Sequence, residues 1–251
     1  MAATLAAGNR PSRYSQEEWD LRVELAAAYR LAAMNGWVDG VATHISARIQ
    51  GRDDFLINPF GLLFQEVTAS NLVKVDGDGD IVEETEHSIN PAGFIIHSAV
   101  HEARPDVGCV MHLHTDEGVA VAALEDGLMP LTQSAMLICD QVAYHEYEGV
   151  SVDIEERQRL GEHLGERNFL ILRNHGLLTA GATVGHAFCR MAALQKACRV
   201  QVMTLAMGQP IRSIRPESRQ RTAEVGAAMK YLITWNAWRR ELDRVTTDYR
   251  A

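Results

Sequence analysis

The spacing of apolar positions predicts several helices along the chain. The stretch from Trp19 to Met34 is rich in Ala and Leu and lacks Gly and Pro, which is typical of a helix. Ser15-Gln-Glu-Glu18 before it has the form of a capping box, and Gly36 is placed to end it. The same criteria predict further helices over residues 91–103, 116–124, 153–166 (capped by Asp153), 183–207 and 217–246.

Short β-branched or continuously apolar runs predict strands between these helices. Asp76-Gly-Asp-Gly-Asp80 is typical of a hairpin turn between two of them, 72–75 and 81–84. The other predicted strands cover residues 43–49, 55–57, 107–112, 142–145 and 169–173. We find no linker and no internal repeat, so we predict one layered α/β domain over residues 15–251, preceded by a flexible arm over 1–14.

Composition and charge narrow the class of protein. A chain of 251 residues buries enough surface to fold without a disulfide or a metal. Lys plus Arg total 24 and Asp plus Glu total 33, and a net charge of −9 argues against a general nucleic-acid binder. The sequence has no apolar run long enough to span a membrane, no secretory signal pattern and no CxxC pair. We therefore expect a cytoplasmic protein that acts on a small molecule and binds neither nucleic acid nor membrane.

Three of the ten histidines suggest a metal site. His112 and His114 are separated by one residue at the end of a predicted strand, so their side chains point to the same face. His175 follows another predicted strand, and strand ends are where α/β sheets gather ligands. Three neutral imidazoles with an open fourth position are typical of catalytic Zn²⁺, and Fe²⁺, Mn²⁺ or Co²⁺ would also fit. The alternative is that these are structural histidines held by hydrogen bonds.

Other histidines leave their roles open. His97 and His101 share one face of the predicted helix 91–103 and could bind a metal with Glu102 nearby. We favour instead a buried His97 that orients its neighbours and an exposed His101. His44 is either a histidine on a strand surface or a site residue. Motifs of serine hydrolases, P-loop proteins, dinucleotide-binding folds and kinases are absent.

Three segments together resemble the class II aldolase/adducin family. They are ARPDVGCVMHLHT, ILRNHGLLTAG and LINPFGLLFQEVTASNLVKVD, within a resemblance that spans about residues 20–207. Within the family, the sequences of these segments most resemble that of the adducin head domain. The resemblance implies a three-layer α/β/α domain around a mostly antiparallel sheet and a homotetramer with active sites between neighbouring subunits. It also implies that His112, His114 and His175 hold one divalent metal per subunit, Zn foremost, with Mn, Fe or Co as alternatives.

The sequence departs from the sugar-phosphate aldolases of that family. Those enzymes resemble one another in a Ser-Ser-Glu run, whose Glu is the catalytic acid/base, where this chain has Pro91-Ala92-Gly93. Their Gly-Asn of the first phosphate loop corresponds to Thr43-His44. We therefore expect a metal-dependent carbon–carbon lyase that does not act on a sugar phosphate. The leading hypothesis is a decarboxylase of a hydroxylated aromatic or pyridine (di)carboxylate, or an enzyme of retro-aldol cleavage. A non-haem Fe(II) oxygenase and a non-catalytic adducin-like interaction module are the alternatives.

Further residues receive roles from the resemblance and from their chemistry. The candidate catalytic residues are His44 as a base, Arg173 as a clamp for a substrate carboxylate and Tyr231 as a proton donor. Arg173 could equally pair with an acidic side chain, and the spacing of Tyr231, Trp235 and Trp238 favours packing. We expect His97 to orient a residue of the site without contacting the metal or the substrate itself. The candidate substrate-binding residues are Asn58, Gly61, Gly93, Gln133 and Ser134, although Asn58 and Gly61 also fit a plain turn.

Overall fold

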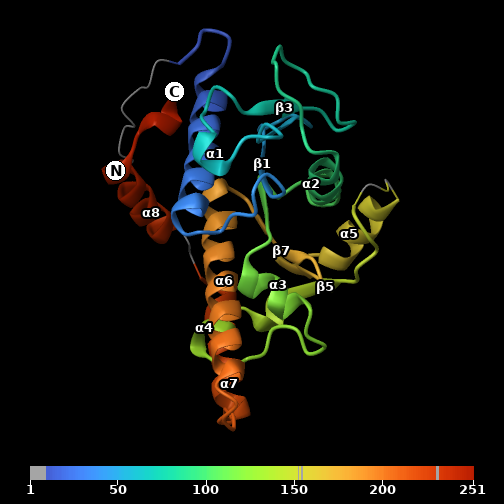
Figure 1. Ribbon diagram of the computed structural model, residues 1–251, viewed down its shortest axis with the longest axis vertical. Helices are drawn as coiled ribbons and strands as arrows, with labels where there is room; N and C mark the ends of the chain where they lie inside the picture. Colours follow the sequence, from blue (N-terminus) through green and yellow to red (C-terminus); the bar gives the residue numbers. More distant parts are fainter. Residues whose placement is uncertain (1–9, 152, 154, 230–231) are drawn as a thin grey trace.

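The structure is a computed structural model that describes residues 10–151, 153, 155–229 and 232–251 (Figure 1). Its α-helices are α1 (Gln16–Met34), α2 (Pro91–Ala103), α3 (Asp116–Ala122), α4 (Gln133–Met136), α5 (Glu156–Leu164), α6 (Val184–Ala206), α7 (Pro216–Ala227) and α8 (Leu232–Val245). Its strands are β1 (His44–Arg48), β2 (Phe55–Ile57), β3 (Val73–Val75), β4 (Cys109–Leu113), β5 (Val142–His145), β6 (Phe169–Leu172) and β7 (Gly176–Gly181). Short 3-10 turns are η1 (Phe64–Glu66), η2 (Cys139–Gln141) and η3 (Asp248–Arg250).

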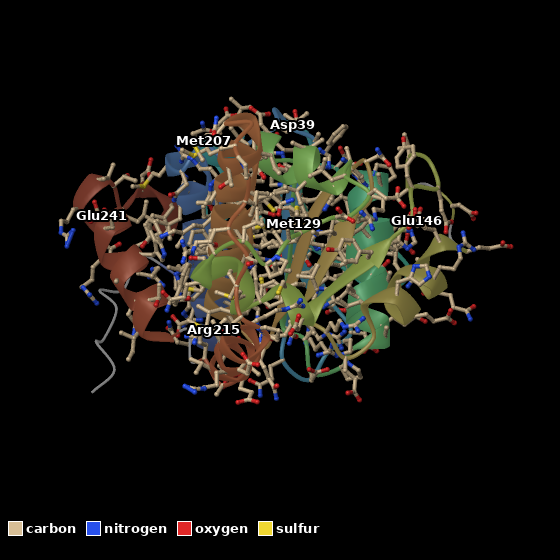
Figure 2. The ribbon with its side chains drawn as sticks, turned by 90° about the horizontal axis from the view of Figure 1, so that it is seen from below. Asp39, Met129, Glu146, Met207, Arg215 and Glu241 are labelled. Atoms are coloured by element: carbon tan, nitrogen blue, oxygen red, sulfur yellow. The ribbon has the colours of Figure 1, made fainter. Side chains whose placement is uncertain are left out.

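The strands form one sheet between two layers of helices. Their order is β3-β2-β1-β4-β7-β6-β5, and every neighbouring pair is antiparallel except β5 and β6, which are parallel. Helices α1, α3 and α6 pack on one face with α8 outside them, and α2 and α5 pack together on the other face (Figures 1 and 2). This arrangement confirms the predicted three-layer α/β/α architecture around a mostly antiparallel sheet. No helix in the described parts of the chain is long and apolar enough to cross a membrane.

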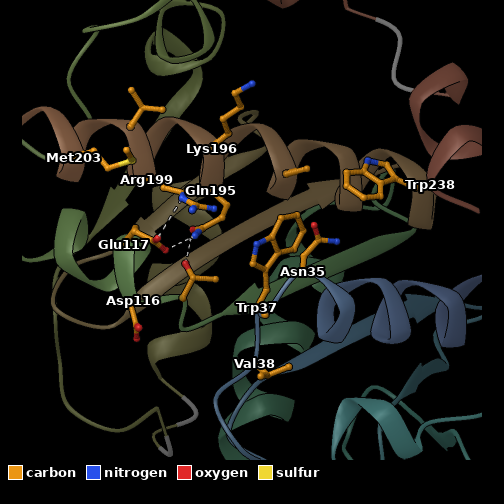
Figure 3. Close-up of a pocket in the computed structure, with 14 residues that line it drawn as sticks. Asn35, Trp37, Val38, Asp116, Glu117, Gln195, Lys196, Arg199, Met203 and Trp238 are labelled. Atoms are coloured by element: carbon orange, nitrogen blue, oxygen red, sulfur yellow. Dashed lines mark hydrogen bonds and ion pairs between the residues drawn. The ribbon is translucent and has the colours of Figure 1, made fainter. Parts of the chain in front are cut away.

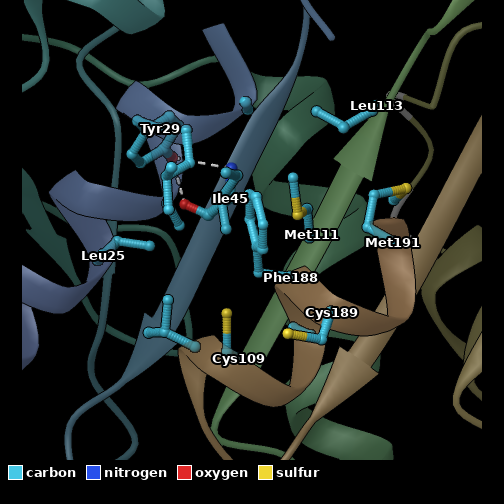
Figure 4. Close-up of a cluster of buried hydrophobic side chains, with 14 of the residues drawn as sticks. Leu25, Tyr29, Ile45, Cys109, Met111, Leu113, Phe188, Cys189 and Met191 are labelled. Carbon is cyan, nitrogen blue, oxygen red and sulfur yellow. Dashed lines mark hydrogen bonds between the residues drawn. The ribbon is translucent and has the colours of Figure 1, made fainter. Parts of the chain in front are cut away.

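The two central strands β1 and β4 present different chemistry on their two faces. Ile45, Met111 and Leu113 point toward α1 and α6, where they join the largest apolar cluster (Figure 4). The residues that alternate with them point toward α2, because side chains along a strand alternate between faces. Among these, His44 lies directly opposite His112 across the antiparallel pair. The polar face of β1 and β4 therefore lies toward α2.

A buried tyrosine fixes the ends of two strands beside this polar face. The hydroxyl of Tyr29 on α1 accepts a hydrogen bond from the backbone N–H group of Ile45 at 2.8 Å (Figure 4). It accepts a second one from the backbone N–H group of Asn58 at 3.1 Å. The same hydroxyl contacts the Ile45 carbonyl and the side-chain oxygen of Asn58. Tyr29 is fully buried, so these bonds are not exchanged for water. The first helix thereby positions the start of β1, where His44 lies.

The structure differs from the sequence prediction in several elements. Residues 81–84 do not form a strand, because only a single bridge joins Val75 and Ile81 after the Asp76–Asp80 turn. Helix α5 begins at Glu156, not at the predicted Asp153, whose carboxylate accepts the N–H of Glu155 instead. The sequence prediction also missed the central strand β7, which begins and ends with glycine.

The C-terminal helix predicted over 217–246 is divided in the structure. Helix α7 ends at Ala227, and α8 begins at Leu232 and packs back against α1 and α6. Trp235 and Trp238 of α8 lie 5.3 Å and 5.9 Å from the ring of Phe188, measured between ring centroids. The packing predicted for these two aromatic side chains is therefore confirmed.

Only part of the predicted N-terminal arm can be compared with the structure. Residues 1–9 lie outside the described residues. Tyr14 is buried, stacks on Trp19 and contacts the guanidinium of Arg22. Ser15 caps α1 as predicted by accepting the N–H of Glu18, whereas the Glu18 carboxylate binds Arg22 and Lys74.

Candidate metal centre

The structure brings His112, His114 and His175 together. His112 lies near the end of β4, His114 directly follows this strand, and His175 lies in the tight turn between β6 and β7. One ring nitrogen of each lies within 4.8 Å of one ring nitrogen of both others. His112 is buried, while His114 and His175 are partly exposed, so a ligand can reach the cluster from solvent. These are the three residues that the sequence predicted as metal ligands.

Hydrogen bonds fix which nitrogen of two rings remains available. The Nδ1 atom of His112 lies 3.1 Å from the Leu177 carbonyl, and the Nδ1 atom of His114 lies 2.9 Å from an oxygen of Asp39. Both oxygens are acceptors, so the tautomer that metal binding requires, with the proton on Nδ1 and a lone pair on Nε2, is the one that these contacts favour for each ring. The two Nε2 lone pairs then face each other at 2.9 Å. Two lone pairs so close repel each other unless a cation lies between them, and partners of this kind are typical of metal-binding histidines. The donor set therefore fits a divalent metal.

A close approach of backbones positions the third histidine. Asn174 adopts a left-handed conformation, with φ of 54°, and turns the chain between β6 and β7. A Cβ atom at Gly176 would lie 2.7 Å from the Leu113 carbonyl and 2.9 Å from the His114 ring. Glycine is therefore required directly after His175, because any side chain would push this turn away from β4.

Burial keeps two of the candidate ligands neutral at pH 7. Burial, together with the neighbouring His114 and His145, lowers the pKa of His175 to about 4. Burial is also the main cause that lowers the pKa of His112 well below its usual range. Neutral imidazole is the form that binds metals, so these side chains need not lose a proton to do so.

His44 lies beside the cluster and fills the space in front of Gly93. Its ring centroid is 5.1 Å from that of His112. A Cβ atom at Gly93 would lie 2.6 Å from Cδ2 and 2.9 Å from Nε2 of His44. A side chain at position 93 and the His44 ring in this position therefore exclude each other. Burial is the main cause that lowers the pKa of His44 to about 3, with smaller contributions from His114 and His175.

His44 continues into a buried chain of hydrogen bonds toward α2. Its Nδ1 atom lies 2.9 Å from Nε2 of His97, and the Ser46 hydroxyl lies 2.5 Å from Nδ1 of His97 and 2.8 Å from Nε2 of His101. His97 thus contacts His44, and its predicted role in orienting the site stays a prediction. The prediction that His101 is exposed is wrong, since only 3% of it is accessible. Glu102 does not join His97 and His101 and pairs with Arg157 instead.

The predicted turn residues Asn58 and Gly61 lie after β2. Asn58 is buried against Tyr29, and Gly61 has φ of 96°, a conformation that favours glycine. These observations agree with the turn interpretation, and binding of a substrate by either residue stays a prediction. The side chain of Arg173 donates to the Leu124 carbonyl at 2.6 Å and lies over the Tyr144 ring.

Among the described residues, Gln133 and Ser134 have no contact with the histidine cluster. Gln133 and Ser134 open the short helix α4, which packs against α6 and α7. Tyr231 lies outside the described residues. The roles of these residues and of Arg173 stay predictions.

Sequence reasoning missed several residues that complete the site. Asp39 holds His114 from a loop 75 positions away, and no motif marks it. Ser46 had a detectable signal, because it shares a strand face with His44 and could meet two histidines spaced by four on a helix. No motif joins His145 and His163, yet their Nδ1 atoms lie 2.8 Å apart.

A cavity of about 630 Å³ lies behind the end of β4 (Figure 3). Trp37 and Trp238 line it, and Gln195 in its wall accepts from Thr115 and donates to Glu117. None of the three clustered histidines lines this cavity. It is therefore distinct from the space that a metal ligand would occupy.

Comparisons with known proteins match most of the chain to a single family. The model of the Class II Aldolase and Adducin N-terminal domain matches residues 23–202. A crystal structure of an aldolase II superfamily protein from Pseudomonas syringae is 48% identical, covers 95% of this chain and 98% of its own, and has a TM-score of 0.92. L-fuculose 1-phosphate aldolase from Glaciozyma antarctica PI12 is 29% identical, covers 96% of this chain and 97% of its own, and has a TM-score of 0.83.

Alpha-adducin is a further relative, but the match covers only a part of it. Alpha-adducin from Mus musculus is 47% identical over 203 residues, which are 79% of this chain but only 28% of that protein. The match with the family model and the likeness to the Pseudomonas syringae protein each cover most of the chain. This protein is therefore a member of the class II aldolase and adducin family.

Proposed function

We propose that this protein is a metal-dependent carbon–carbon lyase, and specifically a decarboxylase of a hydroxylated aromatic or pyridine (di)carboxylate. The observation that carries the proposal is the exclusion of any side chain at Gly93 by the ring of His44. A carboxylate base that takes a proton from carbon has no room at this position. A reaction that forms the carbanion by breaking a carbon–carbon bond does not need such a base.

His112, His114 and His175 would hold the metal, with Zn²⁺ first and Mn²⁺, Fe²⁺ or Co²⁺ as alternatives. When bound, a divalent cation stabilises negative charge on a substrate hydroxyl and carboxylate. Asp39 keeps the His114 ring in its orientation, and Leu177 does the same for His112.

His44 would carry the proton in this reaction, because the negative charge that the substrate brings next to its ring raises its pKa above the value of about 3 that it has in the free protein. Its Nε2 atom takes the proton of the substrate hydroxyl, the bond between the ring carbon and the carboxylate breaks, and CO₂ leaves without the bonding electron pair. The pair stays on the ring carbon, which takes the proton back from His44. No oxidant or reductant is required. In a retro-aldol reaction, the same atom of His44 would take the proton of the hydroxyl next to the bond that breaks.

The remaining candidate residues belong to this proposal. Arg173, whose Nε atom lies 3.9 Å from a carboxylate oxygen of Glu146, would bind a substrate carboxylate through the nitrogen that neither Glu146 nor Leu124 contacts, and Asn58, Gly61 and Gly93 would border the substrate. Gln133, Ser134 and Tyr231 would act from a neighbouring copy if the chain forms a homotetramer with sites between subunits.

Two other functions have specific support. The likeness to alpha-adducin favours a non-catalytic interaction module as the second candidate. Three histidines with open positions would also suit an Fe²⁺-dependent oxygenase.

The proposal is tested by measuring metal content and CO₂ release together. Protein reconstituted separately with Zn²⁺, Mn²⁺ and Fe²⁺ is supplied with a panel of hydroxylated benzoates and pyridine carboxylates. We expect about one metal per chain, CO₂ release that a chelator abolishes, and loss of both in His175→Ala. His87→Ala, which changes a histidine outside the cluster, serves as the matched control and should behave as wild type.

The possible results separate the candidate functions. Oxygen uptake with Fe²⁺ in place of CO₂ release would establish the oxygenase. Metal binding without turnover of any substrate in the panel would favour the interaction module. Unchanged metal content in His175→Ala would refute the site itself.

A further inference from the structure

We propose that the cavity of about 630 Å³ between α3, α6 and α8 binds a small aromatic anion, such as an aromatic carboxylate. None of the three clustered histidines lines this cavity, so the site is separate from the candidate metal centre. It requires neither a metal nor the proposed reaction, and it adds a second ligand site to the chain.

Four separate parts of the chain form the walls of the cavity (Figure 3). The loop after α1, the start of α3 and helix α8 close three sides. Helix α6 closes the fourth with residues spaced by three or four positions, which lie along one face of a helix: Ala192, Gln195, Lys196, Arg199, Val200 and Met203. Volumes of about 300–1,000 Å³ are typical of small-molecule sites. The cavity therefore has the size of such a site, and packed elements set its shape.

Two indole rings give the cavity its preference for an aromatic ligand. Trp37 and Trp238 line it and are half-buried. Their rings lie 5.6 Å and 5.9 Å from the ring of Phe188, measured between centroids, so the apolar interior holds both in place. Val38 and Met203 add exposed apolar surface beside them. A flat ring that enters the cavity would remove this surface from water and contact the indoles at a low entropic cost.

The polar groups at the start of α3 satisfy one another. Thr115 donates to the side-chain oxygen of Gln195, and Gln195 donates to Glu117 at 2.6 Å. Thr115 and Gln195 are buried, so these bonds are shielded from water. Arg199 offsets the charge of Glu117, since its Nε atom lies 3.8 Å from a carboxylate oxygen. This side of the cavity is therefore rigid and needs no charged partner from a ligand.

Lys196 supplies a charge that the protein does not neutralise. Its side chain is exposed, and it makes no ion pair or hydrogen bond within the described parts of the chain. Ala192 and Val200 stand four positions before and after it, so α6 offers no carboxylate in reach. Asp116 also lines the cavity, but it lies in the first turn of α3, where helical N–H groups stabilise a negative charge. The charge left for a ligand is therefore positive, although the chain as a whole carries −9.

Titration calorimetry with 2-naphthoate at pH 7 tests this proposal. Metal-free protein is used, because an aromatic carboxylate could otherwise bind through a metal at the histidine cluster. We expect one naphthoate per chain. The uncharged 2-naphthamide has the same rings and should bind about fivefold more weakly, which is the contribution of one exposed ion pair.

Variants on α6 separate the contributions of charge and shape. Lys196→Met keeps the apolar stem of the side chain and should weaken naphthoate about fivefold while leaving naphthamide unchanged. Arg221→Met is the matched control, because Arg221 is an exposed cation on α7 that does not line the cavity. Ala192→Phe should fill the cavity and abolish binding of both compounds. His175→Ala should bind naphthoate as the wild type does.

Several results would overturn the proposal. They are failure of the wild type to bind naphthoate, loss of binding in His175→Ala, and binding that neither Lys196→Met nor Ala192→Phe alters. Sedimentation of the same samples shows whether a second copy of the chain covers the cavity instead. In that case naphthoate would not bind, and Ala192→Phe would dissociate an oligomer. Metal content and turnover do not enter this test, so their failure would refute the proposed function alone.

Discussion

Replacing Gly93 by alanine tests the packing on which the proposed chemistry depends. The added Cβ atom would lie 2.6, 2.9 and 3.0 Å from three atoms of the His44 ring. Non-bonded carbon atoms pack at about 3.5–4.0 Å, so the ring or the first turn of α2 must move by about 1 Å. Alanine at position 93 therefore forces either His44 or the helix out of place.

The expected energies differ in sign between two backgrounds. Overpacking a buried site costs about 1–3 kcal/mol, while replacing a helical glycine by alanine gains about 0.5–1 kcal/mol. Gly93→Ala should therefore lower the free energy of unfolding by about 1 kcal/mol in the wild type, and by up to about 2.5 kcal/mol. In the His44→Ala background the clash is gone, and the same change should stabilise the protein by about 0.5–1 kcal/mol.

A double-mutant cycle measures this coupling directly. Urea unfolding of the wild type, the two single variants and the double variant, all metal-free and at one protein concentration, should give a coupling energy of about 1–3 kcal/mol. The loss of the His97 partner in His44→Ala occurs in both arms of the cycle and cancels. If Gly93→Ala has the same effect in both backgrounds, His44 does not pack against Gly93 and the argument against a base at position 93 fails.

Three further predictions concern the groups around the site. Asp39→Asn weakens the hold on the His114 ring and should reduce metal affinity by about 10- to 100-fold, measured by competition with a chelator; unchanged affinity would mean that this bond does not orient the ligand. Tyr29→Phe leaves buried N–H groups without an acceptor and should cost about 1–3 kcal/mol in urea unfolding, and a neutral result would contradict the role of its hydroxyl. Because the pKa of His101 is lowered to about 3, the unfolded chain binds the additional proton between pH 6.5 and 3, so stability is retained above pH 6.5 and falls as the pH falls through this window. His101→Phe should make that dependence shallower by about 1.4 kcal/mol per pH unit, and identical slopes would show that His101 titrates alike in both states.

The sequence predicted those elements that depend on local signals. Helix α2 was predicted with its observed bounds, because Pro91 opens it and Pro105 follows it. The strand β7 was missed because a short run between two glycines has no helical or strand periodicity of its own, and its place is set by pairing with β4 and β6. The break between α7 and α8 depends likewise on the packing of α8 on α1 and α6.

The candidate site likewise contains residues that local patterns indicate and residues that only distant contacts bring there. The HxH spacing and a histidine at a strand end suggested that His112, His114 and His175 would meet, and the resemblance to the family implied it. Asp39 and Ser46 could not be predicted from local patterns, because each acts on a histidine far away in the chain. The burial of His101 was misjudged for a related reason, since the partner that shields it comes from β1.

The two chemically different faces of β1 and β4 have a consequence for how this family diversifies. Ile45, Met111 and Leu113 stabilise the fold from one face, whereas His44 and His112 lie side by side on the other face, next to the candidate metal site. Substitutions at the positions of His44 and His112 can therefore replace one chemistry by another, or remove it, without changing the apolar side chains that hold the sheet to α1 and α6. Relatives as different in name as an L-fuculose 1-phosphate aldolase and an alpha-adducin can thus share one scaffold.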